Sequence, residues 1–427
     1  MKKCLFVIIA LLFLFSVNYA QKIRTTTSET KNIKRCGTNE YMEYMKMLDT
    51  TLEKRLQTIE EFVQQWVAEH PTGSDEKAVI TVPVVVHVIY ANSTQNISDA
   101  RVQEQITILN RDYSGQNPHS MYGFSSSLKT NTELQFCLAK RTPTGEYTNG
   151  INRKQTTVSQ FQFGNNMKHV STGGADQWDP HKYMNVWVCN LGGGLCGFAE
   201  FPTSNLSSNY GVVIDYRYFG ITGAQYPYNG GGTTTHEIGH CFSLYHIWGD
   251  DNGACTGTDY CADTPNQASE NFGTPTYPKT DACTQSSPGV MFMNFMDYVD
   301  DIAYANFTPN QKSRIQACFA TGGPLVSLKT SNACTSSDIK ENNISDILKI
   351  FPNPSNGLFY LNFNLAYTDN AEITVCNMLG DIITKIKKQK TSSDYILINI
   401  TNQPEGMYYV KIQTATQTIT RKILFFK

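Results

Sequence analysis

Three of the eight histidines in this chain lie within one run of eleven residues, HEIGHCFSLYH. His236 and His240 are four residues apart, so on a helix both imidazoles point to the same face, where they can bind one metal ion. Glu237 lies between them and can reach a water on that metal. His246 supplies a third nitrogen if the chain reverses near Ser243. Three protein ligands leave the fourth tetrahedral position open, so the spacing predicts a catalytic zinc site.

A second motif, MNFMDYVDD, occupies residues 293–301, and FTPNQ follows it. With the histidine motif, it makes the chain between Val79 and Phe319 resemble the pappalysin family of metzincin zinc peptidases. The resemblance implies that Met296 forms an apolar floor beneath the zinc ligands and that Tyr298 helps to stabilise the tetrahedral intermediate. Ordinary packing of a buried methionine and a half-buried tyrosine is the alternative. A helix that buries its histidines without a metal is the alternative for the first motif.

The resemblance also implies hydrolysis of protein or peptide substrates. Zinc would polarise the scissile carbonyl and lower the pKa of a water to about 7, and Glu237 would carry the proton to the leaving amine. An extended substrate would pair by β-augmentation with an edge strand at Gly197, Phe198 and Ala199. Asp301 lies five residues after Met296, where family members that prefer basic residues have an acid at the base of the S1′ pocket. The resemblance therefore implies a preference for Arg or Lys at P1′. A solvated loop aspartate is the alternative, and the neighbouring Asp300 leaves the register open.

Ser243 departs from the family pattern, which has glycine or asparagine at this position. The helix is expected to end here, and the chain needs a positive φ to turn back toward His246. A serine in that conformation costs on the order of 1 kcal/mol, which weakens the turn without excluding it.

The loop TDYCADTPN resembles a calcium site of the same family. The implied ligands are the side chains of Asp259, Thr264 and Asn266, together with the backbone carbonyls of Thr258 and Ala262. Hard oxygen ligands at irregular spacing suit Ca²⁺. The family has an acid at the position of Asn266, so we expect weakened binding. An Asp-rich turn without a metal is the alternative.

The chain has twelve cysteines, which suggests disulfides in an exported protein. Cys4 would leave with the signal peptide, and the odd number that remains requires at least one unpaired thiol. Cys36, in the run KRCGTNE, resembles the cysteine switch of zinc zymogens, in which a thiolate fills the fourth zinc position. A disulfide of the pro-segment is the alternative. The resemblance further implies a Cys255–Cys283 bridge, and the remaining cysteines receive no partner from the sequence.

The elements that position these motifs follow from hydrophobic periodicity. Alternation of strands with a helix ahead of the zinc motif indicates an α/β subdomain with a mostly parallel sheet. The Gly-, Asp- and Thr-rich stretch after His246 indicates a lower subdomain built from loops. We expect a helix over residues 99–113 capped by Ser98 and strands over residues 79–90, 133–139, 183–189, 195–201 and 211–216.

Five segments are expected along the chain. Residues 1–20 combine two lysines with an apolar run, which predicts a secretory signal peptide too short to cross a membrane. Residues 21–74 form a pro-segment with one amphipathic helical pattern from Tyr41 to Val67. The catalytic domain then spans 75–325 and a linker spans 326–346.

Residues 347–427 carry short strand patterns separated by turn signals, which predicts a small β-sandwich. The runs FPNPSNG and PEGMYYVKI make it resemble the C-terminal sorting domain of Bacteroidetes type IX secretion cargo. The resemblance implies export through the periplasm, with the type IX secretion machinery as partner, to a secreted or cell-surface location. A carbohydrate-binding module is the alternative.

The formal net charge of −2 provides no basic field for nucleic acid. After signal removal, no apolar run is long enough for an integral membrane segment. The sequence therefore predicts an α/β catalytic domain followed by an all-β domain, in a secreted zinc endopeptidase made as a latent zymogen with one zinc and a structural calcium. A catalytically inactive surface adhesin or a glycan-binding protein is the alternative function, and the complete set of histidines, Glu237 and Tyr298 argues against it.

Overall fold

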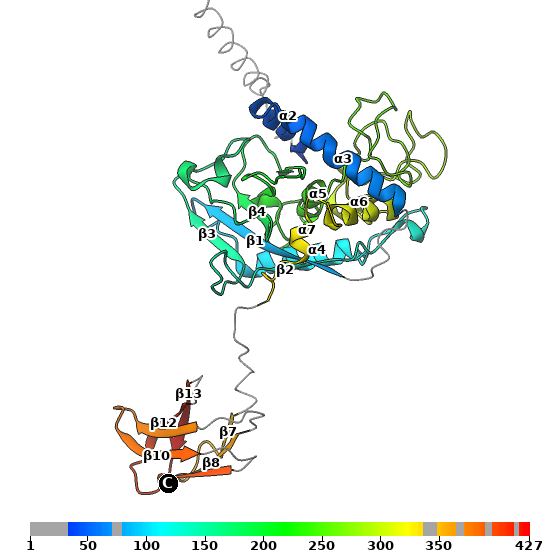
Figure 1. The fold of residues 1–427 in the computed structure, drawn as a ribbon. Helices are drawn as coiled ribbons and strands as arrows, with labels where there is room; N and C mark the ends of the chain where they lie inside the picture. Colours follow the sequence, from blue (N-terminus) through cyan, green and yellow to red (C-terminus); the bar gives the residue numbers. More distant parts are fainter. Residues whose placement is uncertain (1–32, 71–78, 336–347, 364–370, 389–394, 414–417) are drawn as a thin grey trace, which may run out of the picture. The chain divides into compact units, whose positions relative to one another are not determined.

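The computed structural model describes residues 33–70, 79–335, 348–363, 371–388, 395–413 and 418–427 (Figure 1). The predicted signal peptide lies outside these residues. The chain divides into a first unit that ends at Ser337 and a second unit that begins at Asp338. Among the helices of the described residues, none combines the length and the apolar character that a membrane span needs.

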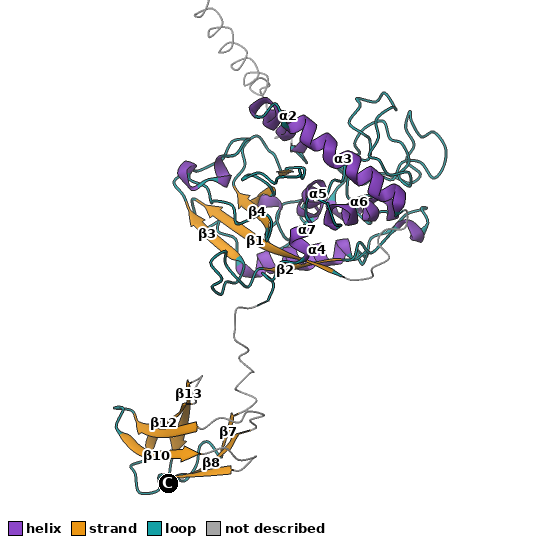
Figure 2. Cartoon of the chain, in the orientation of Figure 1, coloured by secondary structure: helices purple, strands orange, loops and turns teal. Residues whose placement is uncertain are grey.

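A mixed six-stranded sheet is the centre of the first unit (Figure 2). Its order is β2-β1-β4-β6-β5, and β3 pairs with the second half of β1 on the same side as β2. All the pairings are parallel except that of β5 with β6, which is antiparallel. The strands are β1 (Ile80–Tyr90), β2 (Leu134–Leu138), β3 (Ile151–Gln155), β4 (Met184–Cys189), β5 (Gly197–Ala199) and β6 (Val212–Asp215).

The five strands predicted from periodicity are confirmed, and β5 is shorter than predicted. Strand β1 is buried over nearly its whole length, as expected of a parallel strand covered on both faces. Helix α4 (Asp99–Tyr113) begins as predicted, because the hydroxyl of Ser98 accepts from the backbone N–H of Arg101 at 3.2 Å. Strand β3 was not predicted, because its sequence INRKQ is polar and only partly buried.

Helix α5 (Gly232–Cys241) carries the histidine motif and is buried at every position. The helix ends as predicted, and Ser243 has a φ of 61°. The N–H of Leu244 donates to the carbonyl of Gly239 at 3.0 Å, so the chain turns back at once. This reversal returns His246 to the same side of the helix as the other two histidines.

The predicted loop-built lower subdomain is confirmed, since the described chain between His246 and residue 300 has no helix or strand. Helix α6 (Pro309–Phe319) follows and begins with a capping box between Thr308 and Gln311. Short 3₁₀ turns occur at Ser126–Leu128, Asn166–Lys168, Val170–Thr172, Tyr216–Tyr218 and Asp301–Ala303.

The first unit extends further than the predicted catalytic domain. Helix α7 (Val326–Lys329) packs near β1, and a disulfide joins Cys334 to Cys137. Residues 326–335, which the sequence assigned to a linker, therefore fold with the catalytic domain. A disulfide to a cysteine 197 positions away attaches this stretch to the sheet, a pairing that the sequence did not indicate.

The N-terminal segment, residues 33–70, contains two helices, α2 (Thr38–Leu48) and α3 (Leu52–Glu69). The prediction of one continuous helical pattern is wrong here. The carboxylate of Asp49 accepts from the backbone N–H and the hydroxyl of Thr51, which ends one helix and starts the next. As a result Leu48 is 61% exposed. Helix α2 packs on β5. Helix α3 packs on α6, beside which it lies in Figure 1.

The second unit consists of a four-stranded sheet, β10-β9-β12-β13, and a three-stranded sheet, β11-β8-β7. Apolar side chains from both sheets form one core, which confirms the predicted small β-sandwich. Its strands are β7 (Leu348–Phe351), β8 (Leu358–Phe363), β9 (Ala371–Asn377), β10 (Ile382–Lys388), β11 (Tyr395–Asn399), β12 (Gly406–Gln413) and β13 (Thr418–Phe425).

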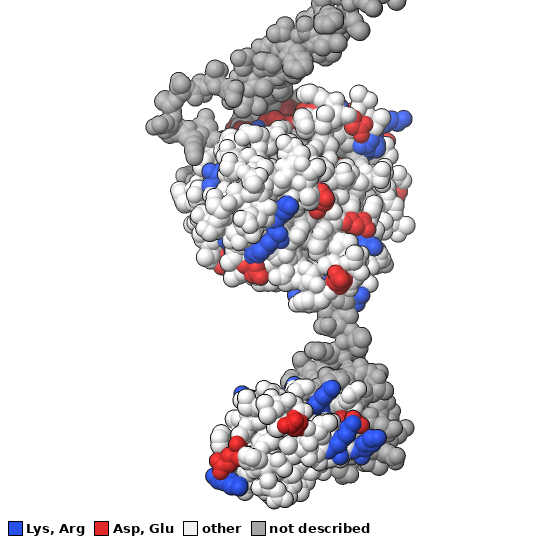
Figure 3. Space-filling view, turned by 90° about the vertical axis from the view of Figure 1, so that its left-hand side faces the viewer, with Lys and Arg blue, Asp and Glu red and all other residues white. Residues whose placement is uncertain are grey.

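Charged side chains are sparse on the face of the first unit that Figure 3 shows, where basic and acidic residues lie scattered among uncharged ones. This distribution agrees with a formal net charge of −2. The view shows no continuous basic field of the kind that attracts nucleic acid.

Candidate active site and metal centre

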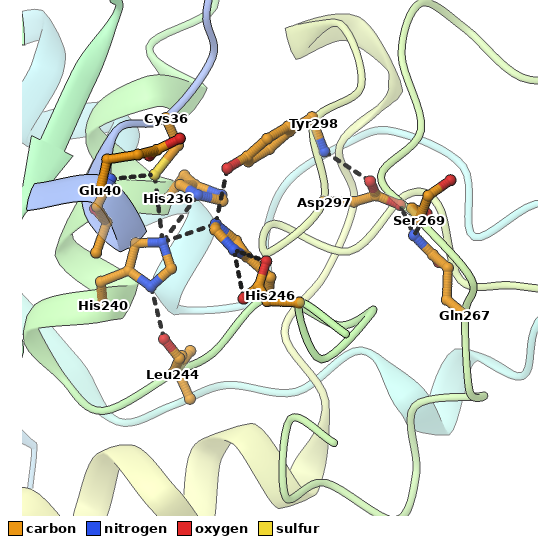
Figure 4. A network of polar contacts seen from close by, with 12 residues as sticks. Cys36, Glu40, His236, His240, Leu244, His246, Gln267, Ser269, Asp297 and Tyr298 are labelled. Carbon is orange, nitrogen blue, oxygen red and sulfur yellow. Dashed lines mark hydrogen bonds and ion pairs between the residues drawn. The ribbon is translucent and has the colours of Figure 1, made fainter. Parts of the chain in front are cut away.

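The three histidines of the motif converge on one point (Figure 4). Nε2 of His240 lies 3.1 Å from Nε2 of His236 and 3.2 Å from Nε2 of His246. Ligand nitrogens about 2.0–2.1 Å from a tetrahedral zinc would be separated by about 3.3–3.4 Å. The spacing of these three nitrogens therefore suits one zinc ion. All three side chains are buried.

The second nitrogen of each ring fixes its orientation. Nδ1 of His236 lies 2.7 Å from the carbonyl of Phe295, and Nδ1 of His240 lies 2.8 Å from the carbonyl of Leu244. Nδ1 of His246 lies 2.9 Å from the carboxylate of Asp250. A proton on each Nδ1 leaves Nε2 as the metal ligand. Burial lowers the pKa of His236 and His240 well below the ordinary value, which favours the neutral form that binds metal.

Cys36 is the fourth member of this cluster. Its Sγ lies 3.6 Å from Nε2 of His240, and the ligand atoms of Cys36 and the three histidines lie within 4.8 Å of one another. No other such group of metal-ligating side chains occurs among the described residues. Burial and the nearby Glu237 raise the pKa of Cys36. A thiolate at this position therefore requires a cation beside it. A metal ion held by the three histidines would be that cation.

Glu237 lies next to the cluster on α5. Its Oε2 accepts from the hydroxyl of Thr38 at 2.8 Å and from the thiol of Cys36 at 3.4 Å. Its Oε1 is buried and has no hydrogen-bond partner in the part of the chain that the structure describes. Burial raises the pKa of Glu237 to about 8. A carboxylate with one unpaired buried oxygen and a raised pKa suits proton transfer at this site.

Met296 contacts α5, and Tyr298 lies beside His246. A Cβ on Gly239 would lie 2.6 Å from Sδ of Met296, so the methionine packs against α5 at a position that only glycine allows. The hydroxyl of Tyr298 lies 3.1 Å from Nε2 of His246, and its ring is half-buried. The phenol therefore stands beside the metal-ligand cluster, within reach of a reacting group there.

Asp301 rather than Asp300 faces the site. Its Oδ2 accepts from the backbone N–H groups of Gly230 and Gly232 at 2.7 and 3.1 Å, at the N-terminus of α5. Its Oδ1 accepts from the guanidinium of Arg35 at 2.6 Å, and both side chains are buried. Asp301 thus has a structural role at the start of the histidine helix and keeps one oxygen for a cation.

The edge strand at Gly197, Phe198 and Ala199 is already covered. The N–H of Gly37 donates to the carbonyl of Gly197 at 2.9 Å, and the N–H of Ala199 donates to the hydroxyl of Thr38 at 2.9 Å. Just before these contacts, residues 34 and 195 form a parallel bridge. Residues 33–38, which we call the plug, therefore lie along the predicted substrate edge.

The candidate calcium ligands are only partly assembled. The hydroxyl of Thr264 lies 2.8 Å from the carboxylate of Asp259, and both are buried. The side-chain amide of Asn266 instead donates to the carbonyl of Cys255 at 2.8 Å. The hydroxyl of Thr258 accepts from the backbone N–H of Tyr260 at 2.9 Å. Ala262 lies in the same loop. Burial raises the pKa of Asp259 to about 6.

The implied disulfide between Cys255 and Cys283 is present, with Cα atoms 5.4 Å apart. The Cys137–Cys334 bridge was not predicted, because no motif or spacing marks it. Cys36 is unpaired, as the switch interpretation requires. Six further cysteines in the described residues are also unpaired: Cys189, Cys196, Cys241, Cys261, Cys318 and Cys376.

Several residues of the site were missed in the sequence. Arg35 and Thr38 flank Cys36 and contact Asp301 and Glu237, and their only signal was adjacency to the candidate switch. Asp250 holds the third histidine from four residues further along the chain, a spacing that could have indicated it. The three consecutive glycines at the start of α5, residues 230–232, carried a signal too, because a run of glycines marks close approach of the backbone to another group, here the carboxylate of Asp301.

Comparison with known proteins identifies both units. Residues 168–320 match the peptidase M43 family model, described as pregnancy-associated plasma protein-A. Residues 349–425 match the secretion system C-terminal sorting domain. An extracellular metalloprotease of Arthroderma benhamiae is 30% identical over 248 residues, which cover 57% of this chain and 79% of that protein. An extracellular metalloprotease of Arthroderma gypseum is 33% identical over 244 residues, covering 56% and 71%.

Solved structures are similar over a larger share of the chain. Mature mirolysin of Tannerella forsythia, in complex with a cleaved peptide, is 45% identical, covers 59% of this chain and 96% of its own, and has a TM-score of 0.58. A mutant of Tannerella forsythia promirolysin is 40% identical, covers 70% and 97%, and has a TM-score of 0.63. The predicted metzincin fold is therefore confirmed.

The sorting domain and the extracellular relatives make this protein a secreted or cell-surface one. The family and the histidine cluster together identify zinc as its metal and peptide bonds as its substrate class. The chain belongs to the pregnancy-associated plasma protein-A family of zinc metalloendopeptidases.

Proposed function

We propose that the chain is made as a latent precursor and that its mature form cleaves peptide bonds on the N-terminal side of Arg or Lys. One observation carries both parts. Two consecutive residues of the plug occupy the two groups that such an enzyme needs, since Cys36 lies on the histidine cluster and Arg35 lies on Asp301.

Latency follows from what the plug covers and from its direction. Cys36 takes the position that a reacting group needs, and Thr38 occupies one oxygen of Glu237. In a substrate with Arg at P1′, that arginine follows the scissile bond, whereas Arg35 precedes Cys36. The plug therefore runs through the site in the reverse direction, and its peptide bonds are not presented for cleavage.

The contacts of Arg35 support a preference for basic residues at P1′. Its guanidinium is bound through a single short contact to Oδ1 of Asp301, because the other carboxylate oxygen is used by α5. The guanidinium also lies 4.0 Å from the ring centroid of Tyr228. A buried carboxylate that offers one oxygen can pair with an ammonium as well as with a guanidinium, so Lys is expected as a second choice.

The roles of the site residues follow from their positions. His236, His240 and His246 would hold zinc, which when bound supplies Lewis-acid polarisation and an acidified water. Glu237, freed from the plug, would accept a proton through its unpaired oxygen and deliver it to the leaving amine. Tyr298 would donate its phenol hydrogen to the developing oxyanion.

Two further parts of the proposal concern folding and export. Asp259, Thr264 and Asn266, with the carbonyls of Thr258 and Ala262, would bind a structural calcium, and the buried Asp259 carboxylate supports this. Residues 347–427 would direct the protein through the type IX secretion machinery after a signal peptide at residues 1–20. The pro-segment would cover residues 21–74, and the catalytic domain would extend from 75 to 335.

Asp301→Asn tests the specificity, because asparagine keeps an oxygen for the α5 backbone and removes the charge. A peptide library cut by activated wild-type enzyme should show Arg and Lys at P1′, and the variant should lose about tenfold to a hundredfold of that preference. Asp300→Asn is the matched control and should retain it. A wild-type profile dominated by apolar P1′ residues would remove Asp301 from this role.

A further inference from the structure

A second side chain of the N-terminal segment lies in a built pocket away from the metal cluster. Tyr41, on α2, is fully buried. Its ring centroid lies 4.7 Å from that of Phe198 on β5 and 6.1 Å from that of Phe163, which it meets edge-on. The ammonium of Lys168 lies 4.5 Å from the same ring centroid. These contacts are those of a binding site for an aromatic side chain.

The pocket also satisfies the phenol hydroxyl of Tyr41. This hydroxyl donates to Oδ1 of Asn165 at 2.7 Å and accepts from Nζ of Lys168 at 3.0 Å. A carboxylate oxygen of Glu200 lies 3.3 Å away as a further acceptor. A phenol has one donor hydrogen and acceptor lone pairs, so the pocket complements both.

The polar groups of the pocket are held by the catalytic domain itself. Nζ of Lys168 also donates to the carbonyl of Asn209 at 2.6 Å. The other carboxylate oxygen of Glu200 accepts from the hydroxyl of Ser207 at 2.6 Å. Departure of Tyr41 would therefore leave a largely pre-formed pocket, with the ammonium of Lys168 and the amide oxygen of Asn165 lacking the partner that Tyr41 supplies.

The position of the pocket relative to the site follows from α2. The hydroxyl of Thr38 donates to Glu237. Thr38 lies three residues before Tyr41 on the same helix, so the Cβ atoms of Thr38 and Tyr41 are about 5–6 Å apart. Arg35 lies on the other side of Cys36, on Asp301. The pocket is therefore on the non-primed side. An extended peptide advances about 3.3 Å per residue, which brings the pocket within reach of P2 or P3.

We propose that this pocket is a non-primed subsite that selects tyrosine side chains at P2 or P3 of substrates. The inference rests on the proposed function and specifies its substrate class further. A phenylalanine in the pocket would leave Lys168 and Asn165 without the hydrogen bonds that the phenol hydroxyl supplies, whereas a tyrosine restores both. Loss of hydrogen bonds of this kind corresponds to about a tenfold difference in kcat/KM between the two substrates.

The test uses the full chain after activation and matched fluorogenic peptides with Arg at P1′. Each peptide has Tyr, Phe or Leu at P2 or at P3 in an otherwise constant sequence. We expect Tyr to exceed Phe about tenfold at one of the two positions. The ratio of Tyr to Phe should fall to near one in Lys168→Met and in Asn165→Leu, measured within each enzyme so that its overall activity cancels.

The controls separate this inference from the function on which it rests. Lys182→Met removes a lysine that lies on the surface and should retain the Tyr preference. If Lys168→Met does not fold, Asn165→Leu and the substrate comparison decide. Cleavage of the Leu peptide establishes the peptidase activity, and equal rates for Tyr and Phe at both positions would then show that the pocket serves the precursor alone. Failure to cut any peptide would count against the proposed P1′ specificity instead.

Discussion

The N-terminal segment meets the catalytic domain through two buried ion pairs of opposite polarity. In the plug, the segment contributes the arginine and the domain contributes the carboxylate, as Arg35 and Asp301. In helix α3, which we call the anchor, the segment contributes the carboxylate and the domain contributes the arginine. Glu60 there pairs with Arg314 of α6 through two contacts of 2.9 and 2.7 Å.

The two pairs leave different groups behind when the segment departs. Asp301 retains its bonds to the α5 backbone and gains an oxygen that needs a cation, which a basic substrate residue can supply. Arg314 retains its bonds to the carbonyl of Ser243 and lies over the rings of Tyr245 and Tyr260. The plug therefore covers groups that substrate uses, whereas the anchor covers groups that hold the turn between the zinc ligands. Inhibition and attachment of the segment are separable.

Of the changes that test whether inhibition and attachment are separable, a substitution in the plug should have the largest effect. Cys36→Ala should raise the activity of the uncut precursor at least about a hundredfold, because it removes the thiolate that the rest of the segment holds at high effective concentration beside the metal cluster. The measurement is the rate at which the precursor cleaves an Arg-containing peptide while its own N-terminal segment remains uncut. Cys376→Ala, which removes an unpaired thiol of the second unit, is the control. If the activity of the Cys36→Ala precursor equals that of the wild-type precursor, the rest of the N-terminal segment causes the latency.

Glu60→Gln should act on attachment instead. Removing one charge of a buried pair leaves the other uncompensated, so the precursor should lose about 3 kcal/mol of unfolding free energy while it stays latent. Denaturant unfolding of the precursor measures this. Glu61→Gln alters the neighbouring exposed carboxylate and should change stability by less than about 0.5 kcal/mol. Equal effects of the two variants would mean that the Glu60–Arg314 pair contributes nothing to attachment.

The sequence predicted the parts of this arrangement that have a local period. The histidines and Glu237 follow from helical spacing, the strands follow from apolar runs, and the turn at Ser243 follows from where the third histidine must go. The loop-rich subdomain and the C-terminal sandwich also followed from composition and turn signals.

Pairings between distant residues could not be predicted in the same way. Arg35 and Asp301 are 266 positions apart, and Glu60 and Arg314 are 254 apart, so only the folded chain brings them together. The same holds for Cys137 and Cys334. Apolar periodicity continued across residues 49–51, but a local side-chain bond from Asp49 broke the helix there. Local hydrogen bonding outweighed the pattern.

Calcium should stabilise the catalytic domain in a pH-dependent way. Burial raises the pKa of Asp259 from 3.8 to about 6, so the folded chain keeps a proton that the unfolded chain has lost. Stability from that proton is present at low pH and is lost as pH rises from about 4 to 6, by up to about 3 kcal/mol. Calcium requires the ionised form and should restore about 2.7 kcal/mol at a hundredfold excess over Kd.

Melting temperature with and without calcium measures this effect at about pH 7.5 and about pH 5. The shift should be large at the higher pH and small at the lower one, and Asp259→Asn should abolish it. Glu270→Gln, in the same region of loops, should keep it. A calcium shift of the same size in Asp259→Asn and wild type would place any calcium site elsewhere.

The smallest expected effect concerns how the plug is separated from the anchor. Lys54–Arg55 is the bond we expect the mature enzyme to cut, since Arg55 would serve as the basic P1′ residue. It lies in the first turn of α3, where Arg55 pairs with Asp49 at 2.9 Å. Cutting there would release the plug and α2 while the rest of α3 stays attached through Glu60. The first turn must open to be cut, so its local stability sets the rate.

Asp49→Ala should therefore speed maturation on the order of threefold, because it removes both the bond to Thr51 and the ion pair to Arg55. Glu43→Ala removes an exposed carboxylate of α2 and is the matched control. Mass spectrometry of the new N-terminus over time gives both the site and the rate. Processing of a Glu237→Ala precursor at the same bond would mean that another protease makes the cut, and the plug would then be released by a partner rather than by the enzyme itself.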